Sequence, residues 1–181
     1  MEELVMRAKQ GDEQAFIEII ISMENDLYKI ARMRLRNDAD IEEAVQETCI
    51  EVFRDIKKLR EVAYFKTWLI KILINKCNYI YKKNKKNCVS FEEKSVDNFY
   101  ISQSMDIIEN RRDFELLIEQ LNYKDRVVIT LFYLEGFSNK DISKILRIPV
   151  STVKNRIARA RHKLKDILES EENVWMILIW R

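Results

Sequence analysis

The sequence predicts an all-α protein with two helical domains joined by a flexible linker. Two glycines and one proline in 181 residues are too few for the many turns of a β protein. Apolar residues recur at helical spacing through most of the chain, and 34% of the residues are charged, as in amphipathic helices. Between residues 87 and 105 this periodicity is lost and serines accumulate, which predicts a linker that is mobile when nothing binds it.

The pattern divides the chain into four parts. We expect one domain over residues 1–86, a linker over 87–105, a four-helix domain over 106–170 and an apolar tail over 171–181. Apolar spacing predicts helices in the first domain over residues 4–9, 13–36, 40–56 and 64–83. In the second domain it predicts helices over residues 106–121, 123–134, 139–146 and 151–170. Expected helix caps are Asp40 with Glu43, Asn122, Ser138 with Asp141, and Ser151.

Residues 138–161 have the pattern of a helix-turn-helix. Pro149 separates the two helices, because proline lacks the amide proton that a helix interior needs. In the second helix Val153, Ile157 and Ala160 are expected to face inward. The outward positions are basic or carry an amide: Lys154, Asn155, Arg156, Arg159 and Arg161. Such a face suits the phosphates and base edges of a DNA major groove better than it suits bulk solvent.

The net charge of +2 conceals a strong local polarity. Residues 62–90 contain seven lysines and no acidic residue, and residues 122–170 contain eleven basic and five acidic residues. Acidic segments precede both blocks. Two separate basic blocks predict two contacts with nucleic acid, and the acidic surfaces are left for a protein partner.

The helix expected at 64–83 combines aromatic and basic residues. Phe65 and Trp68 recur at helical spacing and are expected in the core, whereas Tyr64, Tyr79 and Tyr81 are expected to be exposed. Exposed aromatic rings among lysines suit an unpaired strand, whose bases stack while its phosphates meet cations. The lysines at positions 82–86 would contact phosphates at the helix end or form only a solvated face.

Six carboxylates lie between Asp38 and Glu51 on one expected helix and its lead-in. A metal site needs carboxylates that converge from different elements, so this cluster is either a solvated face or a docking face for a protein. No cofactor or metal is expected, and no nucleophile–base pair or glycine-rich phosphate loop indicates catalysis. Three cysteines without C-x-x-C spacing, and no signal peptide or membrane-spanning run, predict a reduced, cytoplasmic protein.

Four segments in order resemble the extracytoplasmic-function group of bacterial RNA polymerase sigma factors. Leu4–Phe16 resembles the opening helix of the family, and Asp40–Phe53 resembles the segment that docks on the polymerase clamp helices. Phe65–Lys83 resembles the helix that reads the promoter −10 element. Leu121–Leu164 resembles the whole of sigma region 4, which contacts the −35 element. The resemblance extends over nearly the whole chain, from about residue 4 to residue 168.

The resemblance implies a transcription initiation factor that is not an enzyme and that binds core RNA polymerase and promoter DNA. It implies core-polymerase contacts at Asp40, Glu43, Gln46 and Glu47. With the basic and aromatic pattern, it implies contacts to the −10 non-template strand at Tyr64, Lys71, Asn75, Asn78, Tyr79, Lys82 and Lys83. It implies contacts to the −35 duplex at Ser151, Thr152, Lys154, Asn155, Arg156, Ala158, Arg159 and Arg161. It also implies an anti-sigma factor, usually membrane-tethered, that holds such a protein inactive.

Other functions remain open at this stage. The chain could be a one-component DNA-binding regulator that uses residues 1–86 for dimerisation or ligand sensing, or, remotely, a nucleic-acid enzyme that uses the carboxylates. We further expect the two domains to close against each other, or against an inhibitor, and so to hide the basic faces. The apolar run Val174–Trp180 either packs on the helices of the second domain or serves as a docking peptide.

Overall fold

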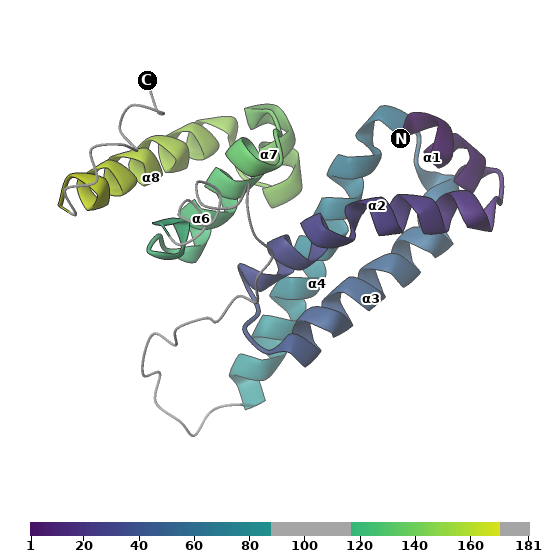
Figure 1. Cartoon of the computed structure of the whole chain (residues 1–181), viewed down its shortest axis with the longest axis horizontal. Coiled ribbons are helices and arrows are strands. Elements are labelled where there is room, and N and C mark those ends of the chain that lie inside the picture. The colour runs from purple at the N-terminus through teal and green to yellow at the C-terminus, as the bar shows by residue number, and fades with distance from the viewer. Residues whose placement is uncertain (88–116, 171–181) are drawn as a thin grey trace, which may run out of the picture.

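The computed structural model describes residues 1–87 and 117–170, and its regular elements there are helical (Figure 1). The N-terminal domain, residues 1–87, contains α1 (Glu2–Lys9), α2 (Glu13–Arg32), α3 (Asp38–Asp55) and α4 (Phe65–Asn87). Two 3-10 turns, Ile56–Lys58 and Val62–Tyr64, lead into α4. The described part of the C-terminal domain, residues 117–170, contains α6 (Tyr123–Ile129), α7 (Asn139–Leu146) and α8 (Val150–Ser170), and a π-helical turn, Thr130–Leu134, follows α6. The all-α prediction with two domains is confirmed.

Several helix boundaries differ from the sequence-based prediction. Helix α2 ends at Arg32 instead of Arg36, and α4 continues to Asn87 instead of ending at Lys83. The predicted cap at Asp40 is wrong, because Asn37 caps α3: its Oδ1 accepts a 2.8 Å hydrogen bond from the Ala39 amide. The predicted cap at Ser151 is also wrong, since Ser151 lies in the first turn of a helix that begins at Val150. The predicted linker, tail and most of the helix at 106–121 lie outside the described residues.

Side-chain caps begin the other helices where the sequence places polar residues. Asp12 accepts a 3.0 Å hydrogen bond from the Ala15 amide at the start of α2. Asn122 and Ser138 accept the Asp125 and Asp141 amides at 3.1 Å and 3.2 Å, which confirms the predicted caps of α6 and α7. Each bond satisfies an amide that the first helical turn leaves without a backbone partner.

The core of the N-terminal domain lies between α2, α3 and α4. Ile19 and Leu27 of α2 meet Ile41 of α3 and Leu69 and Leu73 of α4, and each is at most 1% exposed. Phe65 is buried as predicted, while Trp68 is only partly buried. The second core joins α6, α7 and α8, and includes Val128, Ile142, Ile145 and Val153. The inward positions predicted for the second helix of the helix-turn-helix, Val153, Ile157 and Ala160, are confirmed.

The two domains contact each other along α4. Helix α7 lies against α4 (Figure 1). The Lys66 Nζ of α4 lies 3.0 Å from the Oε2 of Glu135, whose side chain is 2% exposed. Lys66 also lies 3.7 Å from Asp26 and 5.4 Å from the centre of the Phe137 ring. The C-terminal domain is thus bound to the N-terminal domain by a charged group that contacts both.

A stacked arginine forms a second contact between the domains. The Arg34 guanidinium lies 3.4 Å from the ring centre of Tyr81 and 4.3 Å from that of Tyr123, so it is held between tyrosines of different domains. Arg126 of the C-terminal domain donates a 3.0 Å hydrogen bond to the carbonyl of Met33, the residue that precedes Arg34. Cation–π contacts strengthen when water is excluded, which favours this closed arrangement. The expectation that the domains close against each other agrees with these contacts, but the expectation that closure hides both basic faces is wrong for α8, where Lys154, Asn155 and Arg159 stay exposed.

Two further features bear on the environment of the protein. No helix in residues 1–87 or 117–170 is long and apolar enough to cross a membrane. Cys49 and Cys77 are free thiols, and burial raises the pKa of Cys77 to about 12, so this thiol stays protonated and unreactive.

Charge reversal at the contact between the domains should open the molecule. In Lys66→Glu a carboxylate would face both Asp26 and Glu135, so we expect a larger radius of gyration in small-angle X-ray scattering. The matched control is the double variant Lys66→Glu with Glu135→Lys, which restores an opposite pair and should return the radius toward the wild-type value. An unchanged radius in the single variant would show that this ion pair does not hold the domains together.

Candidate nucleic-acid interface

The outer face of α8 is open to solvent. Ser151, Lys154, Asn155, Ala158, Arg159 and Arg161 are exposed, while Thr152 and Arg156 are half-buried. Val153 and Ile157 on the opposite face fix the rotation of the helix, because both are buried against the domain core. The eight residues predicted to contact the −35 duplex therefore lie on one helix, six of them exposed. A helix presented in this way can enter a major groove.

Two arginines on α8 have partners within the C-terminal domain. The Arg159 Nη2 and Nε donate hydrogen bonds of 2.5 Å and 2.8 Å to the two oxygens of Asp125. The Arg161 Nε donates to the Tyr133 hydroxyl at 2.5 Å, and its guanidinium lies 5.4 Å from the centre of that ring. These contacts fix the direction of both side chains, so neither samples solvent freely.

The Asp125 carboxylate is 2% exposed although it carries a charge. Burial disfavours its ionised form, but hydrogen bonds from Arg159 and from Asn122 outweigh burial, and the pKa of Asp125 lies below its ordinary value. The Asn122 Nδ2 donates to Asp125 Oδ2 at 2.6 Å. The residue that caps α6 thus also holds the carboxylate that binds Arg159.

The predicted −10 contacts lie along α4 and just before it. Tyr64 and Tyr79 are 49% and 66% exposed, as predicted, whereas Tyr81 is half-buried beneath Arg34. Tyr64 precedes α4 and lies 4.8 Å from Lys144 of the C-terminal domain, measured from Nζ to the ring centre. The rest of the set is exposed at Asn75, Lys82 and Lys83 and half-buried at Lys71 and Asn78.

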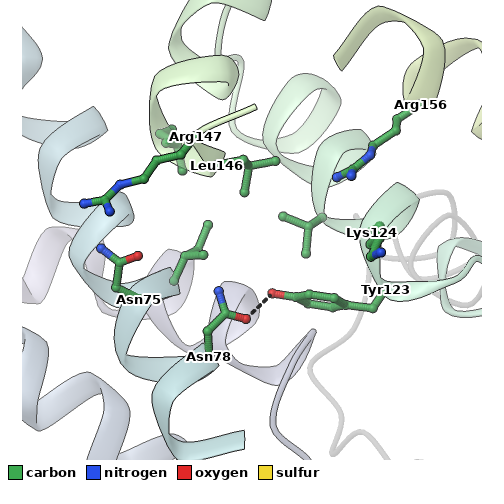
Figure 2. Close-up of a pocket in the computed structure, with 10 residues that line it drawn as sticks. Asn75, Asn78, Tyr123, Lys124, Leu146, Arg147 and Arg156 are labelled. Carbon is green, nitrogen blue, oxygen red and sulfur yellow. Dashed lines mark hydrogen bonds between the residues drawn. The ribbon is translucent and has the colours of Figure 1, made fainter. Parts of the chain in front are cut away.

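The two predicted DNA-binding surfaces meet at a pocket of about 170 Å³ between the domains (Figure 2). Asn75 and Asn78 line it from α4, and the Tyr123 hydroxyl donates a 3.4 Å hydrogen bond to the Asn78 Oδ1 across it. Burial raises the pKa of Tyr123 to about 12, so this hydroxyl keeps its proton. The other polar residues that line the pocket are Lys124, Arg147 and Arg156. In this arrangement the C-terminal domain lies against two of the residues predicted to read the −10 strand.

Some acidic residues of α3 face α4 and others face outward. Asp40 accepts a 2.7 Å hydrogen bond from Asn84 of α4, and the Lys76 Nζ lies 3.3 Å from Glu47 and 2.9 Å from Glu51. The hydrogen bonds that Lys76 donates to Glu51 and Glu47 raise the pKa of Lys76 above its ordinary value. Part of the predicted polymerase-docking set therefore faces α4 and has partners within the domain.

The outward face of α3 combines polar and apolar groups. Glu43 and Gln46 are exposed there, and Ile50 and Phe53 are 59% and 51% exposed. Phe53 packs edge-on against Phe16 of α2, with ring centres 5.0 Å apart. Exposed large apolar groups next to polar ones are typical of a protein-binding surface.

Sequence reasoning missed Tyr123, Asp125, Arg34, Ile50 and Phe53. The sequence could have indicated that Ile50 is exposed, because it lies outside the apolar stripe of α3 that contains Ala44, Thr48 and Val52. The sequence carried no such indication for Tyr123, Asp125 and Arg34, since their contacts join residues distant in sequence. In the part of the chain that the structure describes, no group of three or more His, Cys, Asp and Glu residues could hold a metal.

Comparisons with known proteins match a family to each of the two domains. Residues 19–87 match the family described as Sigma-70 region 2, and residues 111–164 match Sigma-70, region 4. The chain is 31% identical over 180 residues to the ECF RNA polymerase sigma-E factor of Haemophilus influenzae, covering 92% of this chain and 94% of that one. It is 29% identical over 175 residues to the factor of the same name from Escherichia coli K12, covering 90% and 91%.

Two solved structures share the fold. CnrH in complex with the cytosolic domain of CnrY matches with a TM-score of 0.65 and 22% identity, over 93% of this chain and 97% of that one. The sigma factor RpoE in complex with the anti-sigma factor NepR from Bartonella quintana matches with a TM-score of 0.66 and 23% identity, over 85% and 96%.

Removing a cation from the exposed face of α8 should weaken DNA binding without changing sequence preference. We expect Lys154→Ala to reduce the affinity for every duplex similarly and to lower the slope of log K against log salt by about 1, because one phosphate contact is lost. Fluorescence anisotropy over a range of salt concentrations measures both. Lys57→Ala removes the same charge from the N-terminal domain and should leave the slope unchanged. A change in sequence preference in Lys154→Ala would place this lysine at a base instead.

Proposed function

We propose, from the premise that this chain belongs to the extracytoplasmic-function group of RNA polymerase sigma factors, that α4 and α8 read the two elements of its promoters. The chain is an alternative sigma factor that directs core polymerase to specific promoters. The observation that carries the assignment of the two helices is the presence of two basic helices, one in each sigma region, on a single chain. Two separated contacts suit a promoter, whose −35 element is a duplex and whose −10 element is opened.

In this proposal α8 lies in the major groove at the −35 element. Its face carries exposed Lys154 for a phosphate and exposed Asn155 and Arg159 for base edges. Amide and guanidinium groups can each form two hydrogen bonds with one base, which is how side chains distinguish bases in the major groove. Ala158 on the same face has only a methyl group, so it can contact a thymine methyl but cannot form a hydrogen bond.

The N-terminal domain would hold the unpaired −10 strand along α4. Exposed Tyr64 and Tyr79 offer rings for base stacking, and exposed Lys82 and Lys83 offer cations for phosphates. Asn75 and Asn78 can bond to the edges of unstacked bases with their amides. Because these amides line the pocket next to the C-terminal domain, strand binding requires the two domains to separate. The closed arrangement is therefore the form without DNA.

The same proposal assigns the exposed face of α3 to core polymerase. Glu43 and Gln46 would lie at the polar edge of that contact, with Ile50 and Phe53 as apolar anchors. Asp40 and Glu47 would act mainly by holding α3 on α4 through Asn84 and Lys76. The protein would carry out no chemistry itself, since the polymerase performs the synthesis.

The surfaces assigned to DNA and to core polymerase also suit a protein inhibitor. The two solved structures that share the fold were determined in complex with the cytosolic domain of CnrY and with the anti-sigma factor NepR. We extend this to the present chain and propose a cytoplasmic protein held inactive by an anti-sigma factor. Because the domains already contact each other through Lys66 and Arg34, an inhibitor need only stabilise a closed form that exists without it.

Run-off transcription tests the function directly. Purified chain added to core polymerase should give discrete transcripts from a genomic promoter library, whereas core polymerase without the chain should give none. Ala substitution of Asn75 should abolish opening of the −10 element but preserve binding to the −35 duplex. If the chain binds duplex DNA yet never directs the polymerase, it is a DNA-binding regulator instead.

Charge reversal on the outward face of α3 should weaken binding to core polymerase. We expect Glu43→Lys to raise the dissociation constant of the chain for core polymerase, and Glu43→Lys with Ile50→Asp to raise it further, with unchanged helicity by circular dichroism. Glu18→Lys makes the same charge change at an exposed position of α2 and serves as the control. Equal affinity in the wild type and in both α3 variants would show that this face contacts only solvent.

A further inference from the structure

We propose that Asp125 is a positioning residue for DNA recognition: it presents the outer edge of Arg159 to a guanine of the −35 element. This inference rests on the proposed function of α8 and extends it to a residue on another helix. Asp125 lies in the first turn of α6, 34 positions before Arg159 in the sequence. It does not itself reach DNA, because its side chain is 2% exposed.

The geometry of the pair separates the two edges of the guanidinium. Arg159 uses Nε and Nη2 to donate to the two oxygens of Asp125, at 2.8 Å and 2.5 Å. The Nη1 protons and the second Nη2 proton then form the opposite edge. The Arg159 side chain is 64% exposed while its partner is buried, so this second edge remains open to solvent on the helix that also exposes Lys154 and Asn155. One arginine can therefore bind the carboxylate and a base at the same time.

Guanine fits the free edge of Arg159. In the major groove guanine presents two adjacent acceptors, N7 and O6, and a forked arginine is the commonest partner of this pair. Adenine offers one acceptor and one donor there, so it would leave one proton of the fork without a partner. The arrangement thus predicts a guanine at one position of the −35 element.

The carboxylate is itself held in place before DNA binds. The Asn122 Nδ2 donates to Asp125 Oδ2 at 2.6 Å, and the Asn122 Oδ1 accepts the Asp125 amide at 3.1 Å. A base contact made by a side chain that is already oriented loses less rotamer freedom than one made by a free arginine. Asp125 also keeps Arg159 from turning toward a backbone phosphate, which would bind every sequence equally.

Selection from a random duplex library tests this inference with the full-length chain alone. The exposed face of α8 is available in the closed form, so the selection does not depend on polymerase. The wild type should prefer guanine at one position by roughly 5- to 150-fold, the range expected of one forked contact. Arg159→Ala should lose this preference. Asp125→Ala should reduce it by about 2- to 10-fold at the same position and leave the other positions unchanged.

Two further variants separate positioning from a structural role. Asp125→Asn keeps the shape of the carboxylate and one acceptor, so it should retain an intermediate preference. The double variant Asp125→Ala with Arg159→Ala should be no worse than Arg159→Ala alone, because the aspartate acts through the arginine. Asp166→Ala removes an exposed carboxylate that pairs with His162 further along α8, and should change nothing.

Three results would overturn the inference: a uniform loss at all positions in Asp125→Ala, an unchanged guanine preference in that variant, or no guanine preference in the wild type. Run-off transcription with core polymerase is the separate readout for the proposed function. A chain that shows the coupled guanine preference but never directs polymerase would contradict the sigma-factor function and leave the role of Asp125 intact. A chain that directs polymerase, but whose guanine preference does not depend on Asp125, would support the sigma-factor function and contradict the role of Asp125.

Discussion

The structure depends on a single helix that must be buried on more than one side. Helix α4 contains Leu69, Ile70, Ile72, Leu73 and Ile74 with only Lys71 between them, and all five are at most 7% exposed. A run of this kind covers more of the helix circumference than one neighbouring layer can bury. Helices α2 and α3 cover part of it, and the C-terminal domain lies beside Ile74 with Val127 and Ile145. Burial of α4 thus links the stability of one domain to the position of the other.

That burial also determines where the polar residues of α4 lie. Asn75 and Asn78 line the pocket next to Ile74, at the border between an apolar contact and solvent. An amide at such a border needs a partner when the domains are closed, and the Tyr123 hydroxyl provides one for Asn78. Asn78, one of the residues suited to an unpaired base, therefore also contributes to the closed form. Binding of a strand and closure of the domains compete for its amide.

Three arginines in the described part of the chain are oriented by residues distant in the sequence. Arg34 is held between the rings of Tyr81 and Tyr123, Arg159 is bound by Asp125, and Arg161 bonds to the Tyr133 hydroxyl. A planar guanidinium can stack or form a fork, so a fixed partner on one edge leaves the other edge with a defined direction. The chain needs such control, because it presents many cations to DNA but must distinguish one promoter from another.

The sequence by itself determined the helical class, the helix-turn-helix and the division of charge, because each rests on local spacing. The caps at Asn122 and Ser138 and the inward face of Val153, Ile157 and Ala160 could be read within a single turn or two. The ends of α2 and α4 could not be predicted from the sequence, since neighbours in space decide how far a helix is stabilised. The sequence also could not predict the pairing of Arg159 with Asp125, of Lys66 with Glu135, or of Tyr123 with Asn78. These contacts join positions 34 to 69 residues apart in the numbering. Such pairs exist only once packing has brought the helices together, so only the tertiary structure decides which predicted DNA contacts are free, which are oriented and which are covered.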